Sequence, residues 1–332
     1  MTDAPLSAPG AATGRSGTVA RAWRGLAHSL VPILTVVAAL LLLWYVACIP
    51  MNAQQSVLEA ERAGAVIDPP TAAERRDLSG VTIALANPGP ALSGAFVQDR
   101  PRLPAPHQIL AELWDTTVGK KITSKRSLVF HAGITLGPTL LGFAIGSLAG
   151  ILLAVGIVYS RVMDLSVMPW AIASQTIPIL AIAPMIIVVL NSVGVQGMIP
   201  KAIISAYLSF FPVTVGMVKG LRAPSPADLD LMRTWNASPL RTLISLRLPS
   251  SLPYLFASLK IAVAAAVVGA IIGELPTGAV RGLGARLLAG SYYGQTVQIW
   301  SALFGAAIVA AGLVAIIAVL ERVTLKRMGL AR

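Results

Sequence analysis

The chain has 332 residues, of which 55% are hydrophobic and only 12% charged, with a formal net charge of +12. Soluble globular domains carry about twice that charged fraction, so the composition excludes an ordinary cytosolic enzyme and a disordered chain and indicates a polytopic membrane protein. One cysteine, Cys48, and three scattered histidines exclude an intrachain disulfide and leave little material for a metal site or a histidine-based triad.

Six stretches are apolar and long enough to cross a bilayer, which takes about 20 residues of helix. None of the six contains Asp or Glu. Pro178 and Pro184 predict that the third stretch is kinked or broken. The expected fold class is therefore all-α, with six transmembrane helices. These stretches are 29–49, 133–158, 168–190, 201–220, 252–273 and 297–319.

The first stretch follows a basic tail, residues 1–28, and ends near Cys48, a pattern that loosely suggests a lipoprotein signal. Its apolar run is about 19 residues, which is longer than the apolar region of a signal peptide. Tyr45 also stands where such a signal has a small aliphatic residue. We therefore predict an uncleaved first transmembrane helix at 29–49.

Residues 50–127 separate the first two spans. The part 51–106 is rich in proline, charge and small residues, and predicts a largely irregular excursion outside the cytoplasm. Its role has two interpretations, a docking surface for a partner and a tolerated insertion. Residues 107–114 then place apolar side chains at helical spacing, which predicts a short amphipathic helix on the membrane surface.

Residues 128–320 are predicted to form a five-helix core. In the first of these helices Gly142, Gly146 and Gly150 recur every four residues and are followed by Ala154. Such a stripe lets another helix approach closely, which favours a compact bundle.

Orientation follows from the basic residues of the short loops, because Lys and Arg are enriched on the cytoplasmic side. One side carries twelve of them and the other three, Lys201, Arg281 and Arg286. The richer side is predicted to be cytoplasmic, with both termini, the loop 221–250 and the tail 321–332. The twelve are Arg15, Arg21, Arg24, Arg161, Arg222, Arg233, Arg241, Arg247, Arg322, Lys326, Arg327 and Arg332.

The cytoplasmic loop predicts two short helices joined by a tight turn. Asp228 and Asp230 suit the start of the first helix, where negative charge is favourable. Asn236 tolerates the left-handed conformation that ends helices. Ser238 is then a plausible cap for a second helix, which we expect Pro249 to close. Several apolar side chains of this loop are exposed unless a partner covers them.

Counted back from Pro249, this loop resembles the coupling motif of binding-protein-dependent ABC importer permeases: Glu-Ala-Ala, three residues, Gly, nine residues, Ile, one residue, Leu-Pro. Asp230 stands for the Glu, Asn236 for the Gly and Leu246 for the Ile, and two bulkier residues replace the alanines. The resemblance assigns these residues to contact with an ATPase: Asp230, Leu231, Met232, Asn236, Ala237, Leu246 and Pro249.

Other segments resemble the sulfonate, nitrate and taurine branch of that family, over about 103–327. They are the third-span sequence at 175–184, the segment 103–110, Lys260 with its neighbours, and Glu274 followed by the Gly-Leu-Gly of 282–284.

The resemblance implies a type I importer permease in a bacterial inner membrane. A second permease chain, expected to be another copy, would complete the path for a small solute such as a sulfonate, nitrate or taurine. Separate ATPase subunits would hold the ATP, and an extracytoplasmic binding protein would deliver the solute. The sequence has no Gly-x-x-x-x-Gly-Lys-Ser/Thr phosphate loop, so we expect no cofactor and no catalysis on this chain, and no nucleic acid partner.

Candidate path residues are Ser174, Gln175 and Thr176, which lie beside Pro178 in an apolar span. They either line the path or form interhelical hydrogen bonds, because a polar group in lipid needs a partner or a cavity. A further candidate is Glu274.

Glu274, at the outer end of the fifth span, either pairs with Arg281 or Arg286 to shape a gate or is a solvated helix end. Lys260, inside that span, either attracts an anion or snorkels and pairs structurally.

Two other classes stay open. An ion-coupled secondary transporter commonly uses carboxylates within the membrane, which the six predicted spans lack. A membrane scaffold without transport has no need of the loop from Asp230 to Pro249 or of a proline-broken span.

Overall fold

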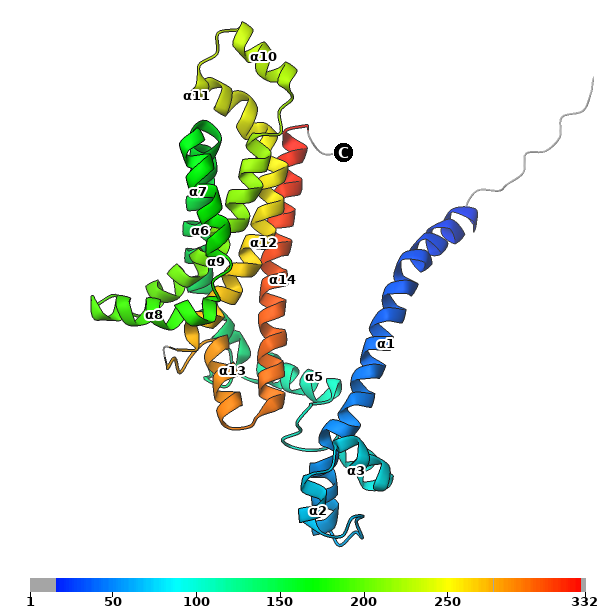
Figure 1. Ribbon diagram of the computed structural model, residues 1–332. Coiled ribbons are helices and arrows are strands. Elements are labelled where there is room, and N and C mark those ends of the chain that lie inside the picture. Colours follow the sequence, from blue (N-terminus) through cyan, green and yellow to red (C-terminus); the bar gives the residue numbers. More distant parts are fainter. Residues whose placement is uncertain (1–15, 277, 330–332) are drawn as a thin grey trace, which may run out of the picture. The chain divides into compact units, whose positions relative to one another are not determined.

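The computed structural model describes residues 16–276 and 278–329, and the elements of that part of the chain are all helices, as predicted. The chain divides into two compact units, residues 1–106 and 107–332. Figure 1 shows the elements of both along the sequence.

The first unit is built on one long helix, α1 (Ser16–Arg62), which contains the predicted first span. Three short helices follow it: α2 (Ala72–Arg76), α3 (Gly80–Ala86) and α4 (Pro88–Gly94). Helices α3 and α4 pack against α1. The prediction of a largely irregular excursion is therefore wrong for the helical residues 51–62, 72–76, 80–86 and 88–94, whereas residues 63–71 and 95–105 are irregular as predicted.

Small side chains let these helices approach one another closely. A Cβ atom on Gly80 would lie 2.1 Å from the Pro50 carbonyl oxygen. The amide of Asn52 also donates hydrogen bonds to the carbonyls of Ala95 and Leu103, at 2.9 and 2.8 Å. The helices of the first unit and the segment between α1 and α2 enclose a small buried core. It consists of Ala53, Val57, Ile67, Ile83 and Ala91.

The second unit starts with α5 (Pro106–Trp114), which the π-helical turn η1 (Asp115–Gly119) extends. Ile109 is 3% exposed, whereas Leu110 and Trp114 are 64% and 69% exposed. The predicted short helix is therefore confirmed.

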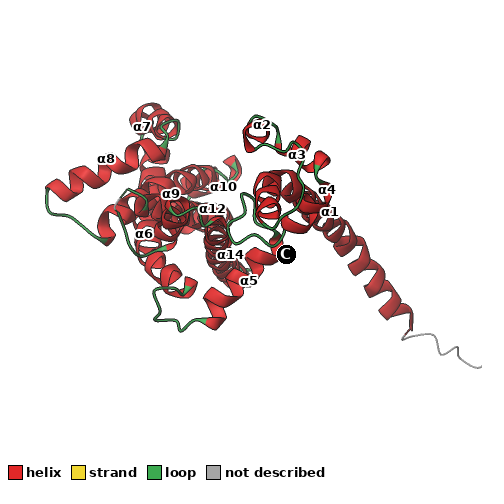
Figure 2. Ribbon diagram, turned by 90° about the horizontal axis from the view of Figure 1, so that it is seen from below, coloured by secondary structure: helices red, strands yellow, loops and turns green. Residues whose placement is uncertain are grey.

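The core of this unit is α6 (Leu128–Tyr159), α9 (Met198–Leu221) and α12 (Leu248–Glu274), with α14 (Thr296–Arg327) packed on α12. Figure 2 shows these helices gathered in one bundle.

The predicted glycine stripe lies against α9. Cβ atoms on Gly142, Gly146 and Gly150 would fall 2.4, 2.7 and 2.7 Å from backbone carbonyl oxygens of α9. Only glycine permits this distance, so the stripe sets the spacing of α6 and α9.

The third predicted span is two helices, α7 (Arg161–Ser174) and α8 (Ile179–Ser192), at 99° to each other. Pro178 is the N-cap of α8, so the predicted break lies there, whereas α8 continues through Pro184. Helix α8 runs away from the bundle (Figure 2). The described part of the chain thus has five helices long enough to span a membrane, or six with this bent pair.

The two ends of the bundle carry different elements. At one end the loop between α9 and α12 contains α10 (Pro226–Thr234), α11 (Pro239–Thr242) and the π-helical turn η2 (Leu243–Arg247). At the other end lie α5 and α13 (Leu283–Tyr292) (Figure 1).

Candidate functional site

The start of α10 is fixed by a capping box. The Ser225 hydroxyl accepts from the Asp228 amide at 3.2 Å, and the Asp228 carboxylate accepts from the Ser225 amide at 3.3 Å. Pro226, at the first helical position, lacks an N–H that would need a partner there. The predicted helix start is confirmed at Asp228. Asp230 is exposed and pairs with Arg233 at 2.9 Å.

Asn236 ends α10 in the left-handed conformation, with φ of 49°. The Ala237 amide donates to the Met232 carbonyl at 3.0 Å, which satisfies one of the carbonyls that a helix end leaves unpaired. Ser238 then caps α11 by accepting from the Arg241 amide at 3.3 Å. Both expected roles, the left-handed turn at Asn236 and the cap at Ser238, are confirmed.

The surface of the two short helices is largely apolar. Beside these residues lies a pocket of about 520 Å³, whose lining includes Met232, Trp235 and Arg241. Apolar patches of this kind mark contacts with another protein or a membrane. Leu231, Trp235, Leu240 and Ile244 are 48%, 70%, 65% and 56% exposed.

Pro249 does not close a second helix, contrary to the prediction. It stands in the first turn of α12, and the helical run from α11 to α12 is continuous. The turn η2 precedes it, and the Leu248 amide donates to the Leu243 carbonyl five residues back. This wider turn accommodates a residue that has no N–H. Leu246 is part of η2 and half-buried.

Two residues that the sequence did not single out join this loop to the bundle. The Tyr159 hydroxyl, at the end of α6, donates to the Pro239 carbonyl at 3.1 Å. The Arg247 guanidinium donates to the Leu221 carbonyl, at the end of α9, at 2.6 Å and lies 5.7 Å from the Tyr159 ring centre. The loop is thus linked to two core helices, to α6 through Tyr159 and to α9 through Arg247. No sequence pattern marked Tyr159, because its role depends on tertiary contact alone.

The candidate path residues lie at the break between α7 and α8. The hydroxyls of Ser174 and Thr176 donate to carbonyls of α7 three residues back, those of Ala171 and Ala173, at 2.7 and 2.8 Å. Gln175 is exposed and donates to the Ser174 hydroxyl at 3.2 Å. The interhelical bond here comes instead from Tyr207 of α9, whose hydroxyl donates to the Ser174 carbonyl.

Glu274 belongs to a separate cluster at the other end of the bundle. It is 0% exposed, so the interpretation as a solvated helix end is wrong. The Thr135 hydroxyl donates to its Oε1 at 2.9 Å, and the Gly284 amide donates to its Oε2 at 2.7 Å. These bonds join the end of α12 to α6 and to the start of α13.

The Gly-Leu-Gly turn of 282–284 wraps this carboxylate. Gly282 has φ of 121°, and a Cβ atom there would lie 2.4 Å from the Glu274 carboxylate. The Gly282 amide donates to Nδ1 of His131 at 3.0 Å, and the imidazole Nε2 contacts the Lys125 carbonyl at 2.9 Å. Because Nδ1 accepts, the proton of a neutral His131 is on Nε2.

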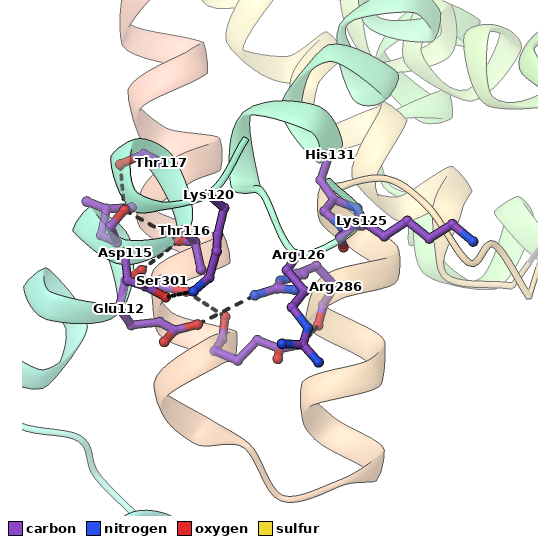
Figure 3. Close-up of polar contacts among 12 residues, drawn as sticks. Glu112, Asp115, Thr116, Thr117, Lys120, Lys125, Arg126, His131, Arg286 and Ser301 are labelled. Atoms are coloured by element: carbon purple, nitrogen blue, oxygen red, sulfur yellow. Dashed lines mark hydrogen bonds and ion pairs between the residues drawn. The ribbon is translucent and has the colours of Figure 1, made fainter. Parts of the chain in front are cut away.

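The two arginines proposed as gate partners each have another contact. Arg286 pairs with Glu112 of α5 at 3.5 Å, as Figure 3 shows. Burial lowers the pKa of the Arg286 guanidinium from its ordinary value, and the Glu112 carboxylate opposes that shift. Arg281 lies 6.0 Å from the Phe130 ring centre. Lys260 forms an ion pair with Glu321 of α14, which agrees with its structural interpretation.

The described residues contain no group of three or more His, Cys, Asp and Glu side chains placed to hold a metal ion. The site therefore consists of an exposed apolar loop at one end of the bundle and a buried polar cluster at the other. Neither arrangement has the form of a catalytic centre.

Comparison with known proteins identifies similar chains. A probable ABC transporter permease of Haemophilus influenzae is 39% identical over 154 residues, which are 46% of this chain and 61% of that protein. The formylaminopyrimidine transport permease ThiX of Halalkalibacterium halodurans is 34% identical over 183 residues, 55% and 68% of the two chains. The riboflavin permease RibX of Chloroflexus aurantiacus is 28% identical over 240 residues, 72% and 84% of the two chains.

Permeases for aliphatic sulfonates and nitrate, from Bacillus subtilis and Leptolyngbya laminosa, also match, at 23% and 24% identity. The matched part of the chain thus spans less than two thirds of the Haemophilus protein, but 68% of ThiX and 84% of RibX. The family model for binding-protein-dependent transport system inner membrane components matches residues 146–329. That range is more than half of the chain, which therefore belongs to this family of inner membrane transport components.

Proposed function

We propose that this chain is the permease subunit of an ATP-driven importer and forms the path for a small solute. The observation that carries the proposal is the exposed apolar surface of α10 and α11, held in a fixed geometry by Asn236, Tyr159 and Arg247. A folded loop of fixed shape whose leucine and tryptophan side chains are uncovered fits a surface that a partner protein covers.

The partner at this surface is an ATPase subunit, and a second copy of the chain completes the path. The distribution of Lys and Arg supports a cytoplasmic position for α10, α11 and both termini. An extracytoplasmic binding protein delivers the solute at the opposite end. The ATP is held by the partner, and this chain holds no cofactor.

The solute is a small organic molecule or anion. The names of the similar proteins include formylaminopyrimidine, riboflavin, aliphatic sulfonates and nitrate. They support the class of small solutes and, within it, both neutral ring compounds and the sulfonates, nitrate and taurine that the sequence suggested. Ser174, Gln175, Thr176 and Pro178 are proposed to border the path at the α7–α8 break.

An ion-coupled secondary transporter gains no support from the carboxylates near the helix ends. Glu274 is bonded to Thr135 and Gly284, and Glu321 is paired with Lys260. Both carboxylates are engaged within the chain, so we do not advance that class further.

A pull-down tests the proposal. The full chain carries a C-terminal tag, membranes are solubilised mildly, and co-purifying chains are identified by mass spectrometry. We expect an ATPase with a phosphate-loop sequence. The substitution Asp230→Leu should reduce its recovery and solute uptake several-fold while membrane insertion is unchanged. The exposed Arg126→Gln, at the other end of the bundle, is the control. An intact chain that recovers no ATPase would overturn the proposal.

A further inference from the structure

Basic side chains gather at the end of the bundle opposite to α10 and α11. We define the outer rim as residues 107–130, 194–201 and 274–295. It holds seven Lys and Arg residues but only three acidic ones, Glu112, Asp115 and Glu274. The basic residues of the outer rim are Lys120, Lys121, Lys125, Arg126, Lys201, Arg281 and Arg286.

The three acidic residues are already engaged. Asp115 pairs with Lys120 at 3.0 Å, and Glu112 pairs with Arg286 at 3.5 Å (Figure 3). Glu274 is buried and accepts from Thr135 and Gly284, although it also lies near enough to Lys201 for an electrostatic interaction. The remaining cations of the outer rim thus exceed the negative charge available to them.

Three of these cations surround one pocket of about 620 Å³. Within the described part of the chain, no ion pair is formed by Lys125, Lys201 or Arg281. The pocket is open to solvent, and Val280 in its lining is 85% exposed. Its lining contains no acidic residue and consists of Lys125, Ile134, Lys201, Ala279, Val280 and Arg281.

Tertiary contacts fix the backbone of Lys125 and Lys201 and place the Arg281 guanidinium over an aromatic ring. The Lys125 carbonyl is bonded to His131, and in Figure 3 the Lys125 side chain extends away from the Glu112–Arg286 pair. Arg281 lies over the Phe130 ring at 6.0 Å. The backbone of Lys201 is fixed by close packing on Gly273, whose added Cβ would lie 3.1 Å from the Lys201 Cα.

We propose that this pocket is an anion site that receives the carboxylate, sulfonate or phosphate group of a solute at the outer mouth of the permease. Like charges at a concave surface raise the local concentration of an oppositely charged ligand. The inference rests on the proposed import function for its role, but the charge and the binding capacity of the pocket can be measured without transport.

The test uses a thiol probe in the full chain in membrane vesicles. Val280 lines the pocket and is 85% exposed, so Val280→Cys places a reactive thiol there, whereas Cys48 is buried and gives the background. Rates of modification are compared for a negatively and a positively charged methanethiosulfonate reagent. The matched control is Tyr292→Cys, 79% exposed and outside the pocket lining. The uncharged N-ethylmaleimide reports accessibility.

Relative to the control, we expect at least about a fivefold preference for the negative reagent at low salt, decreasing as salt is added. The preference should vanish when Lys125, Lys201 and Arg281 are all changed to Gln and persist in Lys121→Gln. Sulfate or methanesulfonate, at matched ionic strength, should slow modification only when the three cations are present.

Equal relative rates for the two reagents, or a preference that survives the triple substitution, would overturn the proposal. A preference for the negative reagent without protection by any small anion would also overturn the solute site. It would indicate that the three cations bind carboxylates of a protein partner instead. Because no readout uses ATPase or uptake, failure of this site is distinguishable from failure of the import function.

Discussion

Glu274, at one end of α12, is completely buried, whereas Trp235, in the loop that leads into the other end of the same helix, is 70% exposed. The buried cluster satisfies a carboxyl group with a hydroxyl and a backbone amide of the same chain. The loop satisfies its backbone through caps but leaves its apolar side chains uncovered.

The difference indicates which end of the bundle is complete in a single chain. A buried carboxyl group is stable only when its hydrogen bonds are made, so the cluster around Glu274 fixes α6, α12 and α13 together. An exposed apolar loop is stabilised further by a partner. Substitutions in the cluster around Glu274 should therefore change stability, and substitutions at the loop should change partner binding more than stability.

The largest loss of stability is expected for Gly282→Ala. The new Cβ would lie 2.4 Å from the Glu274 carboxylate, at a φ of 121° that alanine rarely adopts. Backbone strain and overpacking together should lower the free energy of unfolding by about 3 kcal/mol. Thermal unfolding in detergent, followed by size-exclusion chromatography of the heated protein, measures the change.

Gly278→Ala is the matched control for that substitution. Gly278 also has a positive φ, 59°, but nothing lies within 4 Å of its added Cβ. It should cost only about 1 kcal/mol. Equal losses of stability in Gly282→Ala and Gly278→Ala would mean that close packing of Gly282 on Glu274 does not stabilise this end of the bundle.

A smaller loss is expected for Gly146→Ala, in the seam that connects the two ends. Its Cβ would lie 2.7 Å from the Ala206 carbonyl oxygen, which cannot rotate away. Overpacking should lower stability by about 2 kcal/mol. The control on the same helix is Gly133→Ala, with nothing within 4 Å of its Cβ. Thermal unfolding in detergent again measures the change. A Gly146→Ala variant as stable as the parent would show that α6 and α9 can separate freely.

Asn236→Val should affect the loop. A β-branched residue at a φ of 49° costs about 1–2 kcal/mol, which distorts the turn between α10 and α11. We expect several-fold weaker recovery of the ATPase, with thermal unfolding of the bundle nearly unchanged. Asn236→Gly keeps the conformation and should behave like the parent. Comparable binding by the Val and Gly variants would contradict a role for this turn.

Tyr159→Phe should have the smallest effect, because it removes only the hydroxyl that donates to the Pro239 carbonyl. The ring under Arg247 stays, and a lost neutral hydrogen bond costs about 1 kcal/mol. Faster amide hydrogen exchange in α10 and α11 should follow, without a change in α13. The exposed Tyr292→Phe is the control. Unchanged amide hydrogen exchange in α11 would mean that the Tyr159 hydroxyl does not help to hold the loop on the core helices.

Much of the core could be predicted from sequence, because transmembrane helices depend mainly on local composition. The apolar stretches, the glycine stripe and the break at Pro178 are local features, and the structure has all three. The turn at Asn236 was predictable for the same reason: the ability of asparagine to adopt a left-handed conformation belongs to the residue itself.

The errors concern features that depend on distant contacts. The environment of Glu274 requires Thr135, 139 residues away in sequence. The excursion folds because α3 and α4 pack on an extension of α1. Glycine makes this close packing possible, whereas the proline, charge and small residues of the segment suggested an irregular chain. Pro249 was misread as a helix end because a π-helical turn before it has no sequence signature.

The continuity of α1 has a mechanical consequence. Its 47 residues form one helix about 70 Å long, continuous from Ser16 to Arg62 through Pro32 and Pro50 and bent along its length in Figure 1. Helices α3 and α4 pack directly against α1 near Pro50 and Asn52. A tilt of about 5° would displace one end against the other by roughly 6 Å. A change in the tilt of α1 at one end is thus passed to its other end. A fluorescent label on α4 would report the tilt angle of α1 in the bilayer.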